Sequence, residues 1–288
     1  MRKMIVAVLG ATTLAISACG ESPEDAQNQS ASANTTEPAT PALTLTRLDC
    51  GTATIKDFDA FFSDKPGLYE KGPREVSDGC YLIRHGEQTL LWDTSFPATL
   101  AGNEEDMGPL VARLSKTVSQ QLAELGVKPQ DIDIVGISHM HSDHTGQAAE
   151  FPNARLIIGK GDFEQTRGKD DPFGPWRKDG ANVTAATADV DVFGDGSVVA
   201  LHLPGHTPDH MALLVKLPSG SVLLSGDLYH SREAREKRGV PPFNTSREQT
   251  LASMDKFEKV AKDTGARVVI QHEPRDIELL PAFPQAAE

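Results

Sequence analysis

The stretch 138–144 reads SHMHSDH and places three histidines and one aspartate directly after an apolar run. An extended backbone sends alternate side chains to the same side, so His139 and His141 can bind one metal ion together. Asp143 and His144, at the turn beyond, can face a second ion. The spacing therefore predicts a metal centre built mainly from nitrogen and oxygen ligands.

The composition agrees with such a centre. Three cysteines in 288 residues are too few for a four-thiolate site, whereas nine histidines are available. The chain carries 28 Lys and Arg against 41 Asp and Glu, a net charge of −13 that repels phosphate backbones. We therefore expect no nucleic-acid partner and a small or neutral substrate. With 39% hydrophobic and 24% charged residues, the chain is typical of a soluble globular protein.

The elements that must position these residues are strands and helices in alternation. Apolar residues spaced four and three apart predict a helix over 110–125. Ser246 as N-cap and Gly265 as stop predict another over 246–264. Short apolar runs predict strands over 43–48, 80–84, 89–92, 132–137, 155–158, 198–203, 211–217, 222–224 and 267–270. Together they indicate one α/β domain.

The N-terminal residues 1–18 have the layout of a lipoprotein signal peptide. A short cationic start and a small apolar run lead to Ser17-Ala18-Cys19, and the run is too short for a permanent membrane span. We expect Cys19 to be lipidated and to become the new N-terminus. Ordinary cleavage near Ala18, leaving a free thiol, is the alternative. Gly20 beside the cysteine resembles outer-membrane sorting, so we expect an exported, lipid-anchored protein that faces the periplasm.

Residues 19–42 are predicted to be this lipidated cysteine followed by a flexible linker. From residue 20 onward the segment has no aromatic residue and no aliphatic one larger than alanine, so it cannot bury enough apolar surface to offset its ordering entropy. The folded domain is therefore predicted over 43–288, a length that suits a single domain.

Three later landmarks join the SHMHSDH segment, and with it they resemble the metallo-β-lactamase superfamily. They read PGHT at 204–207, SGD at 225–227 and QHE at 271–273. The resemblance spans residues 43–280. It implies an αββα sandwich of two mixed sheets flanked by helices, with two divalent metal ions at one sheet edge.

The same resemblance assigns ligands to the two ions. One ion is expected on His139, His141 and His206, the other on Asp143, His144 and His272, with Asp227 bridging both. The resemblance also indicates two residues that support the ligands without binding metal themselves. They are Asp93, which matches an aspartate that orients a metal-bound histidine, and His210. Ser95 stands where the family commonly has glycine. His85 and His202 match no ligand position and are expected to be structural.

Within the superfamily, the sequence is most similar to the N-acyl homoserine lactonases. The similarity is distributed over LDCG at 48–51, YEKGPRE at 69–75, CYLIRH at 80–85 and VFGDGS at 192–197. The bridging Asp227 argues against true β-lactamases, and His141 argues against the flavin-linked members. The short tail after His272 argues against hydroxyacylglutathione hydrolases. The acidity of the chain argues against nucleases. The resemblance implies a quorum-quenching hydrolase that opens the lactone ring.

The lactonase resemblance also proposes catalytic groups. Asp143 is expected to hold and pass on a proton, while two cations supply hydroxide and polarise the ester carbonyl. Many lactonases have a tyrosine soon after the bridging aspartate. This favours Tyr229 as the residue that hydrogen-bonds the lactone, although its spacing from Asp227 leaves His230 as the alternative. Zinc is the expected metal; iron, manganese and cobalt stay open. The alternatives in function are another ester or organophosphate hydrolase and a non-catalytic metal-binding lipoprotein.

Two further expectations concern cysteines and aromatic residues. Cys50 and Cys80 lie in or beside predicted strands, and two buried free thiols are expected, with a disulfide as the alternative. Five aromatic residues in predicted loops could line an apolar groove or simply pack: Phe61, Phe62, Phe173, Trp176 and Phe243.

Overall fold

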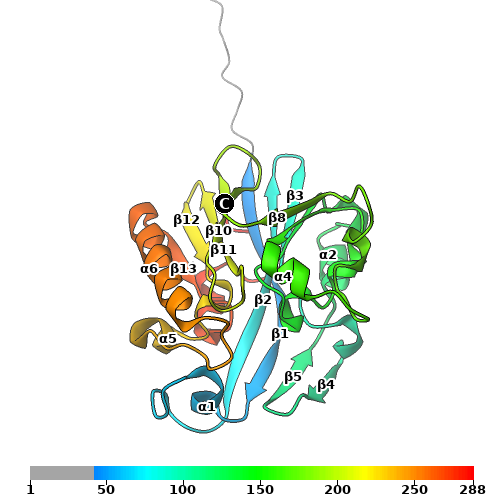
Figure 1. Cartoon of the computed structure of the whole chain (residues 1–288). Helices are drawn as coiled ribbons and strands as arrows, with labels where there is room; N and C mark the ends of the chain where they lie inside the picture. The colour runs from blue at the N-terminus through cyan, green and yellow to red at the C-terminus, as the bar shows by residue number, and fades with distance from the viewer. Residues whose placement is uncertain (1–41) are drawn as a thin grey trace, which may run out of the picture. The chain divides into compact units, whose positions relative to one another are not determined.

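The computed structural model describes residues 42–288, in which two mixed β-sheets face each other. The predicted signal peptide over 1–18 and nearly all of the linker over 19–42, including Cys19, lie outside the described residues. The larger sheet has the strand order β4-β5-β1-β2-β3-β6-β7-β8, and the smaller has the order β13-β12-β11-β10-β9. Figure 1 shows the two sheets with helices on their outer sides.

The strands of the larger sheet are β1 (Leu43–Ile55), β2 (Arg74–His85), β3 (Gln88–Trp92), β4 (Asn103–Asp106), β5 (Leu110–Leu114), β6 (Ile134–Gly136), β7 (Arg155–Gly159) and β8 (Val183–Ala186). Those of the smaller sheet are β9 (Val190–Asp191), β10 (Val198–His202), β11 (Met211–Leu217), β12 (Gly220–Leu224) and β13 (Arg267–Val269). The helices are α1 (Phe58–Phe62), α2 (Val118–Glu124), α3 (Ser142–Thr145), α4 (Lys160–Gln165), α5 (Arg232–Lys237) and α6 (Arg247–Thr264).

Three apolar clusters hold the layers together. The central cluster joins the facing sides of the sheets, for example Trp92 of β3 with Leu213 of β11. A second cluster packs α2 on the larger sheet through Val118 and Leu122, and a third packs α6 on the smaller sheet through Phe257. Each sheet is thus buried on both faces, which explains the long apolar runs in β7 and β11. The predicted αββα sandwich is confirmed.

The nine predicted strands are present, but the predicted helix over 110–125 is wrong. Residues 110–114 form strand β5, paired with β1, and only Val118–Glu124 is helical. Thr117 begins this helix with a capping box, since its hydroxyl accepts from the Gln120 amide and the Gln120 side chain accepts from the Thr117 amide. The predicted helix that follows Ser246 is confirmed and ends at Gly265, whose φ is 60°.

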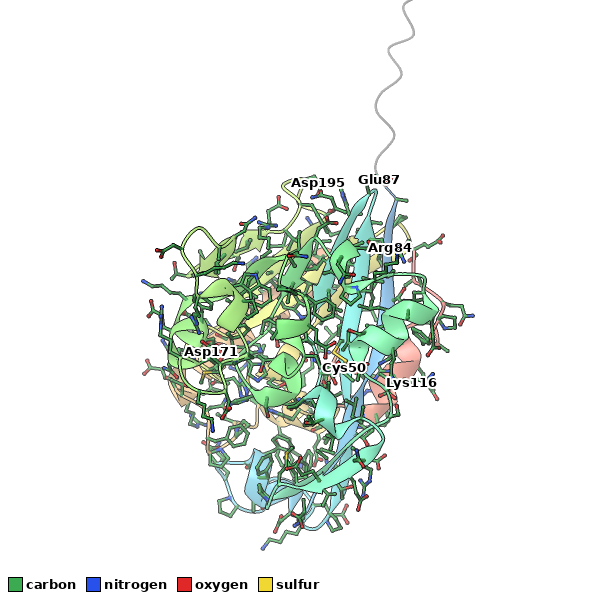
Figure 2. All side chains as sticks on the ribbon, turned by 90° about the vertical axis from the view of Figure 1, so that its right-hand side faces the viewer. Cys50, Arg84, Glu87, Lys116, Asp171 and Asp195 are labelled. Carbon is green, nitrogen blue, oxygen red and sulfur yellow. A yellow bond between two sulfur atoms is a disulfide. The ribbon has the colours of Figure 1, made fainter. Side chains whose placement is uncertain are left out.

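Cys50 and Cys80 are joined by a disulfide, so the expectation of two free thiols is wrong. Their Cα atoms are 5.7 Å apart, and the bond is drawn beside the Cys50 label in Figure 2. The regular register of β1 and β2 places Leu48 opposite Cys80, and a bulge between Asp49 and Gly51 lets Cys50 reach across. Within residues 42–288, every helix is too short or too polar to span a bilayer.

Candidate metal centre

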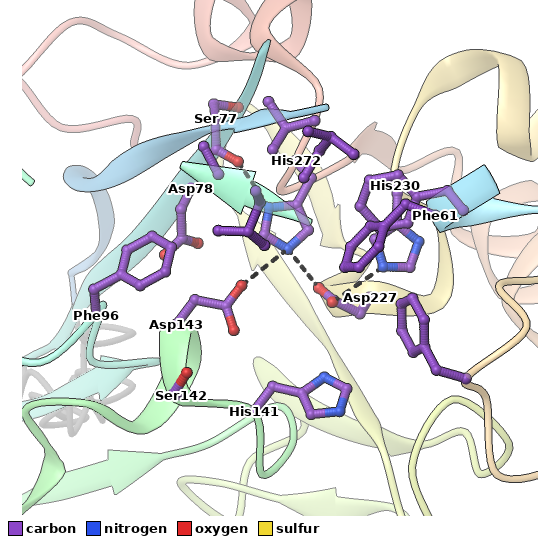
Figure 3. Close-up of a pocket in the computed structure, with 16 residues that line it drawn as sticks. Phe61, Ser77, Asp78, Phe96, His141, Ser142, Asp143, Asp227, His230 and His272 are labelled. Atoms are coloured by element: carbon purple, nitrogen blue, oxygen red, sulfur yellow. Dashed lines mark hydrogen bonds and ion pairs between the residues drawn. The ribbon is translucent and has the colours of Figure 1, made fainter. Parts of the chain in front are cut away.

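The residues predicted to bind metal lie together in two groups of candidate ligand atoms, each group within 4.8 Å. One contains His139, His141, His206 and Asp227, and the other contains Asp143, His144 and His272. Figure 3 shows Asp143, Asp227 and His272 around one point at the floor of a pocket, with His141 nearby.

Strand direction explains why distant segments meet here. β10 and β12 both run antiparallel to β11, and β13 runs parallel to β12, so the carboxyl ends of β10, β12 and β13 share one edge. His206, Asp227 and His272 follow these three strand ends, and the segment 138–144 follows β6 of the facing sheet. The ligands therefore come from the same edge of both sheets.

Asp227 stands between the two groups. Its Oδ2 lies 3.4 Å from Nε2 of His206 and 3.6 Å from Nε2 of His139. Its Oδ1 lies 2.9 Å from Nε2 of His272 and 3.2 Å from Nε2 of His144. Each carboxylate oxygen thus faces one group, which is the geometry that a bridging ligand requires.

Three ligand histidines form hydrogen bonds on the ring side that points away from the centre, and these bonds set their tautomers. Nδ1 of His144 donates to Asp93 at 3.0 Å, Nδ1 of His206 to Asn244 Oδ1 at 2.9 Å, and Nδ1 of His272 to the Ser77 carbonyl at 2.8 Å. Each Nδ1 therefore carries the hydrogen, and each Nε2 presents a lone pair to the centre.

The inner nitrogens fit a cation rather than one another. Nε2 of His139 and Nε2 of His206 are 3.3 Å apart, and each lies close to Nδ1 of His141, at 2.9 Å and 3.2 Å. Neutral imidazoles cannot satisfy three converging nitrogens by hydrogen bonding alone. On the side of the other group, Nε2 of His144 and the Asp227 oxygen that faces it, Oδ1, are buried without a hydrogen-bond partner. The residues therefore suit two divalent metal ions.

The pKa shifts differ between the ligand histidines, and those of His139 and His206 agree with metal-binding protonation states. Burial, together with the neighbouring His144, lowers the pKa of His139 well below its usual range, and burial does the same for His206. Burial opposes ionisation of Asp227, but the histidines around it, His272 foremost, hold its pKa well below normal. His139 and His206 thus offer neutral imidazoles beside a carboxylate. Against the effect of burial, Asp227 raises the pKa of His144 and raises that of His272 to about 9, so a metal ion must displace a proton from these two ligands.

Two buried side chains, Asp93 and His210, form hydrogen bonds to the ligand residues. Asp93 accepts from His144 Nδ1 through one oxygen and from the Ser138 amide, at 2.7 Å, through the other. His210 accepts from the Asp227 amide at 3.0 Å, and burial lowers the pKa of His210 to about 3, so it is a neutral acceptor. Asp93 and His210 thus contact a ligand residue from outside the centre, and their supporting roles stay predictions.

Asp162 was not predicted from the sequence. Its carboxylate accepts from the amides of Met140 and Asp209, at 2.9 Å and 2.8 Å, and so ties the loop of His139 to the loop of His206. An aspartate three residues into a short helix gives no sequence signal for this role.

Backbone conformation also limits which residues fit near the ligands. Gly205, directly before His206, has a φ of 134°, and a Cβ there would lie 2.2 Å from the Thr250 amide nitrogen. Ser95 has a φ of 64°, which explains why glycine is favoured there, and its hydroxyl donates to the Cys50 carbonyl at 2.8 Å. Gly205 in particular allows the loop to dock on the start of α6.

The structure does not bring Tyr229 to the pocket, so its predicted contact with substrate is wrong. Its hydroxyl donates to Glu258 of α6 at 3.0 Å, and its ring packs edge-on against Phe257. The preceding 3-10 turn (Gly226–Leu228) points Tyr229 toward the helix and its neighbour His230 toward the pocket. Nε2 of His230 lies 3.2 Å from Oδ2 of Asp227.

The pocket over the ligands has a volume of about 410 Å³ and mostly apolar walls. Three of the five aromatic residues considered above line it, namely Phe61, Phe62 and Phe243, whereas Phe173 and Trp176 are core residues. Phe62 stacks on His230 with ring centroids 4.1 Å apart. The other apolar lining residues are Ala53, Ile55, Val76, Phe96 and Leu110.

His85 and His202 lie outside the centre, as expected. His85 pairs with Asp195 at 2.8 Å, and His202 pairs with Asp209 at 2.6 Å. Both pairs join loops to strand ends.

Residues 79–272 match the family model of the metallo-beta-lactamase superfamily. With the two-sheet fold and the ligand groups above, the chain belongs to this superfamily. Among its relatives, the N-acyl homoserine lactonase AttM of Azorhizobium caulinodans is 36% identical over 177 residues, which cover 58% of this chain and 66% of the relative. An N-acyl homoserine lactonase of Bacillus cereus is 26% identical over 215 residues, covering 72% and 85%. The chain matches 63% to 66% of the length of the AttM relatives.

Solved structures give the same fold. A quorum-quenching N-acyl homoserine lactone hydrolase superposes with a TM-score of 0.73 at 23% identity, over 86% of this chain and 99% of the other. AidC, described as a dizinc quorum-quenching lactonase, superposes with a TM-score of 0.60 at 18% identity, over 86% and 90%.

Proposed function

We propose that the protein is a dinuclear metal-dependent hydrolase that opens the lactone ring of N-acyl homoserine lactones. The observation that carries this proposal is the pairing of two ligand groups across Asp227 with an apolar pocket directly above them. The relatives named N-acyl homoserine lactonase support the choice of substrate.

Bound divalent cations would lower the pKa of a water molecule and polarise the ester carbonyl. The seven ligand residues would hold the cations, and zinc is the metal that we propose because histidine and carboxylate ligands suit it. A structural neighbour described as dizinc supports this choice.

The side chains of the pocket have distinct roles in this proposal. Asp143 is about a quarter exposed, and its Oδ2 lies 3.8 Å from Nε2 of both His144 and His272. Its other oxygen is therefore available to take the proton of the attacking water and return it to the leaving alkoxide. The apolar wall, with Phe61 and Phe243 in contact at 5.2 Å between ring centroids, accepts the acyl chain and excludes water.

The direct test is hydrolysis of N-hexanoyl and N-decanoyl homoserine lactone, with the product identified by mass spectrometry. Ring opening adds one water and keeps the acyl chain on the product, whereas release of the free fatty acid would indicate an amidase. An aryl ester or phosphotriester turned over far faster than any lactone would favour a different hydrolase of the same fold. Bound metal without turnover of any of these compounds would favour a metal-binding protein without catalytic activity.

We also propose that the protein is exported and anchored by a lipid on Cys19, facing the periplasm at the outer membrane. The signal layout of residues 1–18 supports this, and so does the Cys50–Cys80 disulfide, because disulfides persist in oxidising compartments. Intact mass of the membrane fraction tests it. A mature chain that lacks acyl mass would refute the anchor without bearing on the activity.

A further inference from the structure

Asp78 is a buried carboxylate in the wall of the pocket. It lies in β2, its exposed fraction is 1%, and Figure 3 shows it beside Phe96 and Asp143. Oδ1 of Asp78 accepts a hydrogen bond from Gln271 Nε2 at 3.1 Å, whereas Oδ2 is buried and has no partner. A buried carboxylate oxygen without a donor is costly, so this atom calls for an explanation.

The metal centre does not account for this oxygen. Among the pocket-lining residues of the described chain, the other buried side-chain atom without a hydrogen-bond partner is Oδ1 of Asp227, which faces His144 and His272. Asp78 belongs to neither ligand group. Asp78 thus lines a pocket with mostly apolar walls, and its buried Oδ2 is an acceptor without a partner.

Gln271 holds Asp78 in a fixed position relative to the ligands. The same Nε2 atom lies 2.6 Å from the Gly79 carbonyl and 3.1 Å from Oδ2 of Asp93, the carboxylate that orients His144. Burial without a second donor raises the pKa of Asp78 to about 7. A ligand that brings an N–H group to Oδ2 would stabilise the ionised form.

We propose that Oδ2 of Asp78 accepts a hydrogen bond from the amide N–H of the N-acyl homoserine lactone, an inference that depends on the function proposed above. This N–H is the only hydrogen-bond donor in an unsubstituted N-acyl homoserine lactone, and it sits on the carbon next to the lactone carbonyl. Asp78 therefore makes the pocket selective for lactones with an acylamino group at that carbon, over alkyl lactones of equal length. A site built to pair with an N–H discriminates strongly against an analogue that lacks one.

The test compares a lactone that carries the acylamino group with one in which a plain alkyl chain replaces it. N-hexanoyl homoserine lactone carries the N–H, and α-heptyl-γ-butyrolactone carries a chain of the same length without it. For Asp78→Asn, the side-chain oxygen still accepts from Gln271 and the new NH₂ group meets the ligand N–H. We expect kcat/KM on the acylamino lactone to fall about tenfold or more, and on the alkyl lactone to change less than about threefold.

A binding measurement complements the kinetics, since the product N-hexanoyl homoserine retains the N–H. Calorimetry should show weaker product binding by Asp78→Asn at unchanged metal content. Asp78→Ser, which is smaller, serves as a second variant if the asparagine variant does not fold. As a contrast, Asp93→Asn disturbs His144 and should lower metal content and the hydrolysis of both lactones alike.

The outcomes separate this inference from the proposed function. If the wild type does not open N-acyl homoserine lactones, the proposed function fails and the inference fails with it. If the wild type opens them but Asp78→Asn loses nothing, or loses equally on both lactones, the inference alone is overturned.

Discussion

Nε2 of His144 lies 3.2 Å from Oδ1 of Asp227, and both atoms are buried without a hydrogen-bond partner. His144 is fixed from behind by Asp93, and the Asp227 amide is fixed by His210. The two atoms therefore stand ready for a shared cation without any rearrangement of the backbone. Removal of Asp227 leaves both ligand groups without their common member.

We expect the wild type to bind close to two divalent ions per chain, and Asp227→Ala to lose most of both metal and activity. The protein is loaded with metal and then dialysed exhaustively to remove the excess. Elemental analysis then gives the metal content, and lactone turnover gives the activity. Asp179→Ala, a change at an exposed aspartate, should retain both ions. A fully active wild type with one ion or fewer would contradict the dinuclear assignment.

Tyr229→Phe should leave kcat/KM on the lactone within about threefold of the wild type, because the phenol bonds Glu258 outside the pocket. It should lower the free energy of unfolding by about 1 kcal/mol through loss of that hydrogen bond. His230→Ala, which removes a pocket group next to Asp227, should lower kcat/KM about tenfold or more. Steady-state kinetics and urea unfolding measure both. A tenfold loss of turnover in Tyr229→Phe at full metal content would instead indicate that Tyr229 is catalytic.

The Cys50–Cys80 disulfide closes a loop with a sequence separation of 30 residues. Constraining a loop of that length in the unfolded chain stabilises a protein by roughly 3–4 kcal/mol. We expect the double variant Cys50→Ala, Cys80→Ala to lose stability of this order in urea unfolding of the metal-loaded protein. Peptide mapping without reductant should recover the two cysteine peptides joined; recovery as separate free thiols would contradict the structure.

Acid should weaken the contact between α5 and α6. Glu258 accepts from Arg235 at 2.8 Å and from Tyr229, and the Arg235 hydrogen bond holds the pKa of Glu258 below its usual range. Because this pKa is depressed in the folded state, the stabilisation is present above the unfolded pKa and is lost as the pH falls through the folded value. Glu258→Gln should therefore lower Tm at pH 7 more than at pH 3.5. An equal loss at both values would mean that the ion pair contributes nothing.

Much of the centre could be predicted because its ligands follow strand ends in short, distinctive segments. His139 and His141 were predicted together from strand periodicity, and the structure places them together. Asp162, Asn244 and Gln271 were missed because their partners are distant in sequence; Asn244 is 38 residues from His206. Such pairs depend on how the two sheets are assembled, which local patterns do not encode.

The error over 110–125 has a different cause. Leu110 and Leu114 are spaced for a helix, but Leu110, Ala112 and Leu114 also alternate as in a strand, and pairing with β1 decides between them. The capping box at Thr117 was a local signal for the true start of the helix. Likewise, the cross-strand reach of Cys50 depends on a bulge in β1 that composition does not reveal.

Part of the apolar wall of the pocket comes from a stretch of the chain that supplies no proposed metal ligand. Ile55, Phe61, Phe62 and Val76 all precede residue 79, where the family match begins, whereas every proposed ligand lies within 79–272. Substitutions in the earlier stretch can reshape the space for a substrate tail without moving a ligand. Substrate range and chemistry can therefore diverge independently, so a library confined to residues 53–76 is a direct route to variants that accept different tails.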